Sequence, residues 1–437
     1  MYQLIRQKVF RTFKKVRRNI MAERRVVITG MGAVTPLGNT VEETWTAVKQ
    51  GKSGIGPITH FDASVNKVHY AAEVKNFDPA VYMDPSAARK MARFSQYACA
   101  AAKMALDDSD LMGKQEILDE TGCILGVGIG GFEVTEAGCL GYAKSGFTKT
   151  APMTIPELIP NEAGGNICMQ YHLHGPTFAV ATACSSGTDA LGTAFDMVRS
   201  GRMNVCLAGG AESTINGYAI VSFEVLHALS TGFDEDPTKA SRPFDKKRNG
   251  FVMGEGSAIL VLEEYEHAKA RGAKIYAEIA GYGASCDGYH LTSPDPTGTV
   301  PSLALKRALK DAGMDGTEIQ YYNAHGTSTH INDPSETNMV KLAFGEEQAR
   351  KLKISSTKSM HGHCLGATGA IEAMLCVKAI TDSFVPATIN LDEVDVEGGC
   401  DLDYTPNKGV EMNVDAAMSA TLGFGGHNGA IIVKKVK

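Results

Sequence analysis

Cys184 is the residue whose type and setting point most directly to chemistry. The apolar run from Phe178 to Ala183 predicts a buried strand, and the stretch from Cys184 to Ser200 predicts a helix, so the thiol lies at a strand-to-helix turn. The unpaired backbone N–H groups at the start of a helix favour negative charge, which makes the reactive thiolate easier to form. The sequence therefore predicts that Cys184 is a nucleophile.

The remaining cysteines have no comparable setting. The chain has ten cysteines, and no two of them have C-x-x-C spacing. This pattern disfavours a zinc ribbon and a dithiol redox motif. Free cysteine is most often a small buried apolar residue. We predict packing roles for Cys99, Cys123, Cys139, Cys168, Cys206, Cys286, Cys364, Cys376 and Cys400.

Two histidines are candidate partners for the thiol. His325 follows a short apolar and aromatic run and is succeeded by Gly, Thr, Ser and Thr, as at the functional end of a strand. His363 lies five residues after Lys358 and just before a helix predicted over Gly366–Ala379. One histidine in such a place is more often structural. Two of them in matching settings predict a catalytic set with Cys184.

Several segments, in the same order, resemble the beta-ketoacyl-acyl carrier protein synthases. They are the surroundings of Cys184, His325 and His363 together with residues 25–32 (RVVITGMG), 241–245 (SRPFD) and 423–426 (GFGG). The resemblance extends from about Arg24 to the C-terminus. Residues 262–269 and 289–294 are most similar to the type II elongating synthase. Several motifs in order are far more specific than any one of them.

The resemblance implies a decarboxylative Claisen condensation by a 3-oxoacyl-acyl carrier protein synthase of fatty acid elongation. The acyl group would pass to Cys184 as a thioester. His325 and His363 would donate hydrogen bonds to the malonyl thioester oxygen as the enolate forms, and the backbone N–H groups of Cys184 and Phe424 would bind the tetrahedral oxyanion. Such an enzyme is an acyltransferase that needs no cofactor and no metal.

The resemblance also implies supporting residues. Lys358 and Glu372 correspond to the family's supporting Lys and Glu and would hold the site together as an ion pair. Thr327 and Thr329 would bind the pantetheine amides of the substrate, and the alternative for both is capping or turn chemistry. Ile129 would be a gate on the acyl channel.

Three departures from the family pattern bear on the pocket. Where the family has Pro-x-Gly-Asp, this chain has residues 330–333 (HIND), so Asn332 is predicted to replace the turn glycine because Asn tolerates positive φ. His361 replaces a Thr, and Leu422 replaces a Phe. The acyl-chain length preferred by the family therefore does not transfer to this chain.

The fold class is predicted from a weak sequence similarity between the two halves of the chain. Residues 26–33 parallel 277–284, and residues 254–261 parallel 426–433. Such self-similarity indicates a duplicated α/β unit, and continuous apolar strands fit sheets covered on both faces. This agrees with the resemblance, which implies thiolase-like duplicated α/β units in a layered α-β-α-β-α architecture. We expect a half at 21–270 that carries the cysteine and a half at 271–437 that carries both histidines.

The first twenty residues differ from the rest. They contain seven basic residues and no acid, so removing them takes the formal charge from -6 to -13. Their apolar residues recur at helical spacing, which predicts a basic amphipathic N-terminal extension over residues 1–20. Organelle targeting, contact with a membrane surface, and a true start at Met21 remain open.

Composition limits the other function classes. With 437 residues, 43% hydrophobic and 21% charged, the chain is typical of a globular protein with two core-bearing units. No apolar segment approaches the roughly 20 residues of a membrane-spanning helix. Ten cysteines without an apolar signal sequence favour a reducing compartment, the cytoplasm.

The resemblance implies two protein partners, an acyl carrier protein and a second copy of the chain. Acyl carrier proteins are acidic, so an acidic enzyme needs a local basic patch. Arg89, Lys90 and Arg93 form the cluster that corresponds to the family's docking site, and residues 246–248 (KKR) form a second. Nucleic-acid binding is disfavoured because the basic residues beyond the N-terminal extension form no extended stripe.

Four rival functions are weighed against this one. A thiolase normally has a second cysteine as base, whereas this chain has His at both partner positions. A non-catalytic chain-length-factor-like subunit usually lacks the cysteine, so Cys184 argues against it. Residues 126–131 (GVGIGG) satisfy G-x-G-x-x-G, but no acid lies between 137 and 156 to bind a ribose, which disfavours a nucleotide-binding oxidoreductase. A ketosynthase of a specialised type II polyketide-like pathway remains the alternative.

Overall fold

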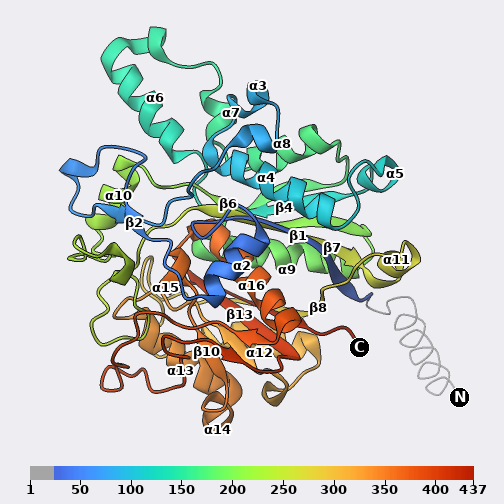
Figure 1. The fold of residues 1–437 in the computed structure, drawn as a ribbon, viewed down its shortest axis with the longest axis vertical. Helices are drawn as coiled ribbons and strands as arrows, with labels where there is room; N and C mark the ends of the chain where they lie inside the picture. The colour runs from blue at the N-terminus through green and yellow to red at the C-terminus, as the bar shows by residue number, and fades with distance from the viewer. Residues whose placement is uncertain (1–23) are drawn as a thin grey trace, which may run out of the picture.

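A single mixed sheet of ten strands runs through the molecule in the order β10-β9-β13-β14-β8-β1-β7-β6-β4-β5 (Figure 1). The computed structural model describes residues 24–437, so the predicted extension over residues 1–20 lies outside the described residues. The strands of the N-terminal half are β1 (Val26–Val34), β4 (Gly122–Gly126), β5 (Thr177–Val180), β6 (Val205–Glu212) and β7 (Gly256–Glu264). Those of the C-terminal half are β8 (Ala277–Cys286), β9 (Tyr321–Asn323), β10 (Lys353–Ser355), β13 (Ala416–Gly423) and β14 (His427–Lys434).

The two halves of the sheet have the same topology. β4 pairs in parallel with both β5 and β6, and β9 pairs in parallel with both β10 and β13. β7 lies antiparallel between β6 and β1, as β14 lies antiparallel between β13 and β8. The halves meet where Val26–Ile28 of β1 pairs antiparallel with residues 277–279 of β8. The duplication predicted from the sequence is therefore present as mirrored strand order.

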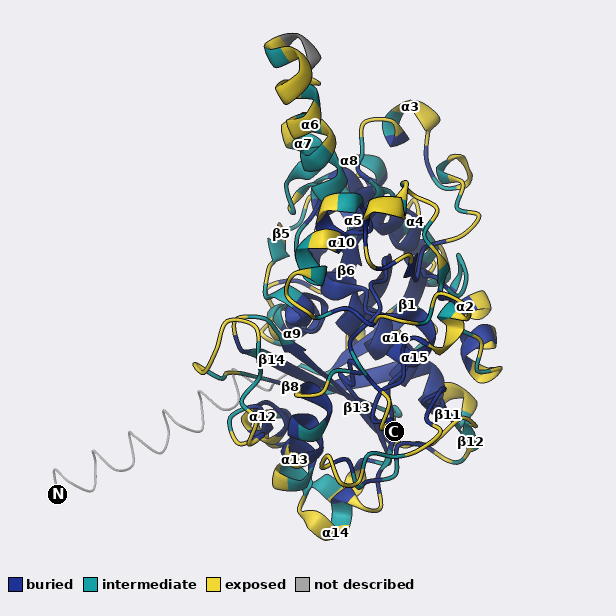
Figure 2. Cartoon of the chain, turned by 90° about the vertical axis from the view of Figure 1, so that its left-hand side faces the viewer, coloured by how far each residue is buried: buried dark blue, intermediate teal, exposed yellow. Residues whose placement is uncertain are grey.

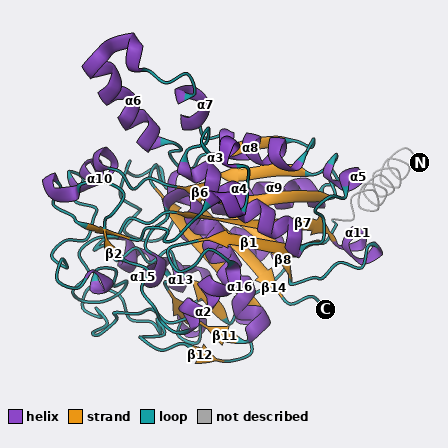
Figure 3. Cartoon of the chain, turned by 45° about the horizontal axis from the view of Figure 1, so that its top comes forward, coloured by secondary structure: helices purple, strands orange, loops and turns teal. Residues whose placement is uncertain are grey.

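The helices form three layers around the sheet. α9 (Ser186–Arg199) and α16 (Thr368–Asp382) lie between the halves, because each contacts strands of both. α4 (Arg93–Asp108) and α8 (Glu162–Tyr171) cover the N-terminal half (Figure 3). α12 (Ser302–Ala312), with α13 (Asn332–Phe344) packed beside it, covers the C-terminal half (Figure 2). This is the layered α-β-α-β-α architecture that was predicted.

The remaining elements are short or peripheral. The other helices are α2 (Val41–Lys49), α3 (Pro85–Ala88), α5 (Gln115–Leu118), α6 (Phe132–Ser145), α7 (Thr154–Leu158), α10 (Gly217–Glu224), α11 (Tyr265–Ala270), α14 (Glu346–Ala349) and α15 (Lys358–His361). Two-residue strands pair as β2 (Gly56–Pro57) with β3 (Tyr70–Ala71) and as β11 (Phe384–Val385) with β12 (Val410–Glu411). The 3-10 turns are η1 (Ala63–Val65), η2 (Pro79–Val81), η3 (Gly146–Lys149), η4 (Ala183–Ser185), η5 (Pro237–Lys239), η6 (Gly316–Glu318) and η7 (Leu365–Ala367).

The same close contact between a helix and a strand occurs in both halves. A Cβ on Gly32 of β1 would lie 2.0 Å from the carbonyl oxygen of Ala101 in α4. A Cβ on Gly283 of β8 would lie 2.2 Å from the carbonyl oxygen of Ala304 in α12. Only glycine permits this approach at either position. The parallel between residues 26–33 and 277–284 therefore includes glycines with one physical cause, the packing of a helix directly on the strand backbone.

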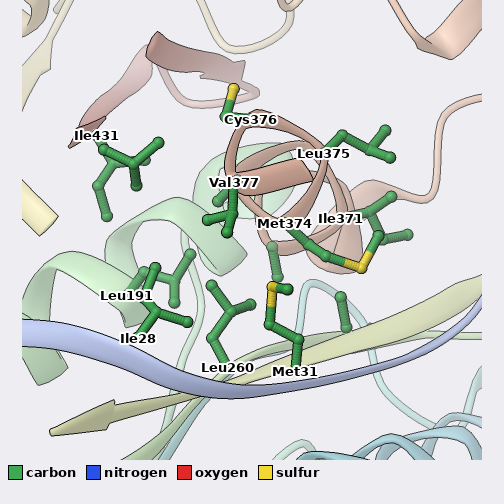
Figure 4. Packing of buried hydrophobic residues seen from close by; sticks show 14 of the residues in the cluster. Ile28, Met31, Leu191, Leu260, Ile371, Met374, Leu375, Cys376, Val377 and Ile431 are labelled. Carbon is green, nitrogen blue, oxygen red and sulfur yellow. The ribbon is translucent and has the colours of Figure 1, made fainter. Parts of the chain in front are cut away.

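The largest core lies between the two halves of the sheet (Figure 4). Leu191 of α9 and Met374 of α16 pack against Met31 of β1 and Leu260 of β7. α16 is buried around its whole circumference from Thr368 to Ile380, as expected for a helix enclosed between the two halves of the sheet. Burying each large apolar side chain stabilises the fold by about 1.5–3 kcal/mol, so this layer holds the two halves in a fixed relation.

The α6–α7 hairpin projects away from the sheet (Figure 2). No residue of α6 is buried. The hairpin nevertheless carries large apolar side chains that are mostly exposed, namely Leu140, Tyr142, Phe147 and Ile155. Among the described residues, no helix is both long enough and apolar enough to cross a membrane.

The prediction of a buried strand over 178–183 is wrong in burial and length. β5 ends at Val180, and it is the edge strand of the sheet with β4 as its one partner. Phe178 is 39% exposed. An apolar run indicates a strand, but it does not indicate whether that strand has a neighbouring strand on each side.

The predicted turn at Asn332 is also wrong. Asn332 is the first residue of α13, and the positive φ of this loop lies at Ser328, with a value of 70°. The buried carboxylate of Asp333 accepts hydrogen bonds from the backbone N–H of Phe244 at 2.8 Å and from Nδ2 of Asn332 at 3.2 Å. These bonds hold residues 332 and 333 at the helix start, so no turn glycine is required there.

Candidate active site

Cys184 lies at the predicted strand-to-helix turn. Ala183, with φ of 51°, turns the chain after β5, and Cys184 follows in η4 directly before α9. A left-handed residue other than glycine costs about 1–3 kcal/mol and persists only where the surrounding structure enforces it. Here the hydroxyl of Ser186 donates to the carbonyl oxygen of Ala183 at 2.6 Å and accepts from the backbone N–H of Thr182 at 2.9 Å. The hydroxyl of Ser186 thus stabilises the turn.

The expectation that the helix start eases thiolate formation at Cys184 is wrong in its net sign. Burial raises the pKa of Cys184 to about 12, because the sulfur has little access to water. The ammonium of Lys358 and the backbone N–H groups of Phe424 and Cys184 lower that pKa, but they do not offset the burial. The resting group is therefore a neutral thiol that faces two backbone donors.

His325 and His363 form a buried imidazole pair. His325 follows β9, and His363 follows α15. Their ring centroids are 5.3 Å apart and their planes are nearly perpendicular, at 86°. Burial and the nearby ammonium of Lys358 hold the pKa of both imidazoles well below the usual value. Both rings are therefore neutral near pH 7, and each has one N–H to donate.

The two rings differ in how they are held. Nδ1 of His363 lies 3.0 Å from the hydroxyl of Thr368, so Nε2 is the nitrogen left for a ligand. Nδ1 of His325 has no hydrogen-bond partner among the described residues. Its backbone is held instead, because the buried carboxylate of Glu336 accepts from the N–H groups of His325 and Gly326, both at 2.7 Å. Glu336 is a supporting residue that the sequence analysis did not identify.

Lys358 and Glu372 form an ion pair in the interior, between α15 and α16. Their side chains are 1% and 0% exposed. Burial raises the pKa of the Glu372 carboxyl, and the ammonium of Lys358 opposes that shift. The ammonium of Lys358 is near both imidazoles, and its charge contributes to keeping both of them neutral.

Breaking this ion pair is expected to destabilise the fold strongly. Lys358→Met leaves the Glu372 carboxylate buried without its cation, which costs about 3–5 kcal/mol of unfolding free energy. Urea unfolding measures the loss. The matched control is Lys351→Met, which breaks an exposed ion pair between Lys351 and Glu347 of α14. This change should lower the free energy of unfolding by at most about 1 kcal/mol. The double variant Lys358→Met/Glu372→Met should recover most of the loss, and equal losses in the single and double variants would contradict this account.

One cavity of about 440 Å³ brings the candidate catalytic residues together. Cys184 and Ile129 line it from the N-terminal half of the fold. His325, His363 and Phe424 line it from the C-terminal half. Residues far apart in the sequence thus share one space where the two halves meet, as the sequence analysis expected.

The 423–426 loop lies directly against the turn that carries Cys184. A Cβ on Gly423 would lie 2.7 Å from the carbonyl oxygen of Thr182 and 3.2 Å from the backbone nitrogen of Cys184. Glycine is therefore required at this position for the loop to approach. The approach brings the backbone N–H of Phe424 to the sulfur, where it lowers the pKa of Cys184. Two N–H groups aimed at one carbonyl oxygen are the arrangement that stabilises a tetrahedral oxyanion.

Thr327 and Thr329 line the same cavity. Their hydroxyls are 3.0 Å apart, and Oγ1 of Thr329 also accepts from the backbone N–H of Asn332 at 3.3 Å. Thr329 therefore has a turn contact of the kind that was the alternative for it. Both hydroxyls remain at the cavity wall, where amide groups of a ligand can meet them.

The predicted docking clusters are only partly surface features. Arg89 and Lys90 are exposed, but Arg93 is half-buried and donates to the carbonyl oxygen of Ile215 at 3.1 Å. In the second cluster Lys246 and Lys247 are exposed, whereas Arg248 is buried and pairs with Asp395 at 2.6 Å. Basic runs in a sequence do not reveal which members turn inward to meet buried carboxylates.

Glu212 is a buried residue, bonded to the cavity-lining Gly128 and Ile129, that the sequence analysis missed. It ends β6, it is fully buried, and its carboxylate accepts from the backbone N–H groups of Gly128 at 2.8 Å and Gly366 at 3.1 Å. Burial raises the pKa of Glu212 to about 7, while these donors lower it. A single acid in a run of small residues does not indicate this role, because its partners come from two segments that are far away in the sequence.

Comparison with known proteins agrees with this geometry. The family model for the beta-ketoacyl synthase N-terminal domain matches residues 23–268, and the model for the C-terminal domain matches residues 276–392. The 3-oxoacyl-[acyl-carrier-protein] synthase 2 of Vibrio harveyi is 46% identical over 95% of this chain and 100% of its own length. The enzyme of the same name from Staphylococcus aureus strain COL is 45% identical over 94% of this chain and 98% of its own.

Solved structures give the same result. A beta-ketoacyl synthase from Burkholderia phymatum STM815 has a TM-score of 0.88 and 37% identity, and covers 95% of this chain and 100% of its own. The ketosynthase/chain length factor of ishigamide has a TM-score of 0.89 and 34% identity, with the same coverage. A type II polyketide ketosynthase solved with its acyl carrier protein has a TM-score of 0.87 and 33% identity, again over 95% and 100% of the two chains. The chain belongs to the beta-ketoacyl synthase family.

Proposed function

We propose that this condensing enzyme is a 3-oxoacyl-acyl carrier protein synthase of fatty acid elongation, an acyltransferase that joins an acyl group on Cys184 to a malonyl unit. The observation that carries the proposal is the convergence of Cys184, His325 and His363 on one cavity. The similarity to the synthase 2 enzymes over nearly their whole length supports the same substrate class. The test is incubation with acyl- and malonyl-acyl carrier protein, with mass spectrometry of the 3-oxoacyl product.

The first step transfers the acyl group to sulfur. The Cys184 sulfur attacks the acyl thioester, the bond to the carrier sulfur breaks, and the proton of the neutral thiol ends on the departing carrier thiol. The carbonyl oxygen becomes an oxyanion on the way, and the N–H groups of Cys184 and Phe424 bind it. The raised pKa of Cys184 means that the thiolate is sparse at rest, so the proton leaves as the new C–S bond forms.

The second step forms the new carbon–carbon bond. The malonyl group loses CO2, and the electron pair of the broken bond becomes an enolate whose oxygen accepts hydrogen bonds from His325 and His363. Its carbon attacks the acyl carbonyl on Cys184, and the tetrahedral intermediate collapses to the 3-oxoacyl product. Cys184 leaves as a thiolate and takes up one proton. Neutral imidazoles suit this step, since hydrogen-bond donors are needed and no proton is removed from carbon.

We propose that the substrate also contacts Thr327, Thr329 and Ile129. The two threonine hydroxyls line the cavity on the side of His325 and would bind the pantetheine amides. Ile129 lines the cavity from the N-terminal half and would gate the acyl chain. Lys358 and Glu372 would support the histidines from behind.

The division into functional halves is part of the proposal. Residues 21–270 would contribute the nucleophile and residues 271–437 the two histidines. The boundary falls in the gap between the two matching family models, and next to the junction of β1 with β8. Neither half would be active alone, because each supplies only part of the cavity.

We propose an acyl carrier protein and a second copy of the chain as partners. Arg89 and Lys90, both exposed, would meet the acidic carrier. The edge strand β5 and the apolar α6–α7 hairpin would form the homodimer interface, since unpaired strand edges and large exposed apolar patches mark association sites. Sedimentation equilibrium measures the oligomeric state directly.

A ketosynthase of a specialised type II polyketide-like pathway is the second candidate. The structures of the ishigamide and hexaketide-bound ketosynthases favour it at 34% and 33% identity, and Leu422 lines the cavity where a larger Phe was expected. The synthase 2 enzymes, at 45–46% identity, favour fatty acid elongation. Loading of Cys184 from a panel of saturated and polyunsaturated acyl carriers separates the two.

Deleting residues 1–20 is expected to leave condensation unchanged. We propose a cytoplasmic enzyme because all ten cysteines are free, which fits a reducing compartment. In a cytoplasmic enzyme the extension would contact a membrane surface and would take no part in the chemistry. The condensation rate of the truncated protein should stay within about twofold of the full chain, whereas binding to vesicles with anionic lipids should weaken if the extension contacts membranes. A folded truncation without activity would contradict this assignment.

A further inference from the structure

Glu212 accepts hydrogen bonds from backbone groups of two segments, residues 128–130 and Gly366. Its carboxylate accepts four backbone N–H groups, from Gly128 at 2.8 Å, Ile129 at 3.3 Å, Gly130 at 3.1 Å and Gly366 at 3.1 Å. The side chain is fully buried. Successive N–H groups turned toward one point form a site that prefers an anion, and here the protein supplies the anion itself.

The first group of donors belongs to the loop that carries the proposed acyl gate. Residues 128–130 follow β4, and Ile129 packs beside Cys184 and Leu365 in one apolar cluster. The far side of this loop is held by the backbone N–H of Gly131, which donates to the carbonyl oxygen of Leu158 in α7 at 3.0 Å. Glu212 therefore holds the inner side of the loop, next to the cavity.

The fourth donor belongs to the segment that carries a proposed catalytic histidine. Gly366 lies in η7, three residues after His363. A Cβ on Gly366 would lie 2.3 Å from the backbone nitrogen of Gly128 and 2.8 Å from Oε2 of Glu212. The gate loop of one half and the histidine segment of the other are thus in direct contact, with the carboxylate between them.

We propose that Glu212 is a positioning residue that couples the acyl gate at Ile129 to the imidazole of His363. The inference rests on the proposed function and deepens it. Because one carboxylate holds both segments, a displacement of the gate loop by an acyl chain moves the acceptor that also holds Gly366. Loading of the acyl chain and activation of the malonyl group would then both depend on the position of the Glu212 carboxylate.

Glu212→Gln tests the coupling with little change in volume. The amide has one acceptor oxygen where the carboxylate uses two, and its NH2 group would face backbone N–H groups that now donate to a carboxylate oxygen, so its hold on the two segments is weakened. We expect hydrogen exchange of peptides covering 127–131 and 365–367 to be at least fivefold faster in this variant. We also expect the ratio of C12 to C4 acyl loading on Cys184 to change at least fivefold, and CO2 release from malonyl-acyl carrier protein to fall at least tenfold.

Two further variants make the test decisive. Glu212→Asp keeps the charge and should change all three quantities less than Gln does. Glu263→Gln is the matched control, because Glu263 is an equally buried carboxylate on β7 whose partners, Thr29, His267 and Arg271, lie outside the cavity. It should lower thermal stability without changing the loading ratio or CO2 release.

The outcomes separate the coupling from the function. A folded Glu212→Gln protein with a wild-type loading ratio and wild-type CO2 release overturns the coupling. A change in only one of the two exchange segments overturns it as well, as do equal effects in Glu263→Gln. A wild-type protein that neither loads Cys184 nor releases CO2 overturns the proposed function and with it the role of Glu212, while the exchange result still reports whether Glu212 joins the two segments.

Discussion

The Cys184→Ala variant should form no acyl-enzyme and should lose condensation by about a thousandfold or more. The sulfur is the one atom on which the proposed thioester is built, and alanine leaves nothing at that position for the acyl carbon to bond. Intact-protein mass spectrometry after incubation with acyl-acyl carrier protein measures the first effect. Formation of 3-oxoacyl product measures the second.

A matched control is available in the neighbouring layer. Cys206 is a fully buried thiol on β6 that does not line the cavity. Cys206→Ala removes the same atoms and should keep acylation within about threefold of the wild type. Product formation by a folded Cys184→Ala protein would overturn the assignment of the nucleophile, and loss of acylation in Cys206→Ala would point to the fold rather than the thiol.

The environment of Cys184 adds a pH dependence to this prediction. Because burial raises the pKa of Cys184 to about 12, the group is protonated across the neutral range. The thiolate fraction then rises about tenfold with each pH unit well below that pKa. Alkylation of Cys184 by iodoacetamide should follow this slope between pH 7 and 10. A plateau above pH 8 would show a thiol that ionises far more easily than its burial implies.

The chemistry could be predicted from sequence wherever residue type and chain position decide it. Cys184 stands at a strand end followed by a helix, and the two histidines stand at breaks after apolar runs, so their convergence required only the duplicated fold. The duplicated fold could be predicted from the similarity of the two halves. Glycines such as Gly32 and Gly283 are part of that similarity, because each lies where a helix packs on the strand backbone.

The errors arose where burial or a distant partner decides the outcome. The helix start predicted an acidic thiol at Cys184, but the loss of water around the sulfur is the larger effect. Arg248 was predicted to lie on the surface, but it is buried and pairs with Asp395. Glu212 gave no signal because its role depends on donors from segments more than eighty residues away in one direction and more than one hundred and fifty in the other.

The second large effect is expected at the two imidazoles. His325→Ala and His363→Ala should each lower CO2 release from malonyl-acyl carrier protein about a hundredfold to a thousandfold, the usual cost of losing one donor to a developing oxyanion. Acyl loading of Cys184 should fall much less, since its oxyanion is bound by the backbone N–H groups of Cys184 and Phe424. Radiolabelled CO2 release and intact-protein mass spectrometry separate the two effects in one preparation.

His361 provides the control for this pair. It is buried two residues before His363, burial lowers its pKa to about 3, and its Nε2 bonds to Thr357 at 3.0 Å outside the cavity. His361→Ala removes an equally buried neutral imidazole and should keep CO2 release within about tenfold of the wild type. Equal losses in all three variants would mean that the two rings act through the fold and not on the enolate.

The pH profile tests why these histidines work as donors. Burial and the ammonium of Lys358 hold the pKa of His325 and His363 well below the usual value, so both rings stay neutral as the pH falls through 6.5. CO2 release should therefore show no inflection near pH 6.5 in the wild type. Lys358→Met removes one cause of the lowered pKa, so the acid limb of CO2 release should move toward higher pH in the fraction of that variant that stays folded. An inflection near 6.5 already present in the wild type would show that at least one ring is solvated and charged, and a charged ring in this cavity would contradict the neutral pair on which the proposed mechanism depends.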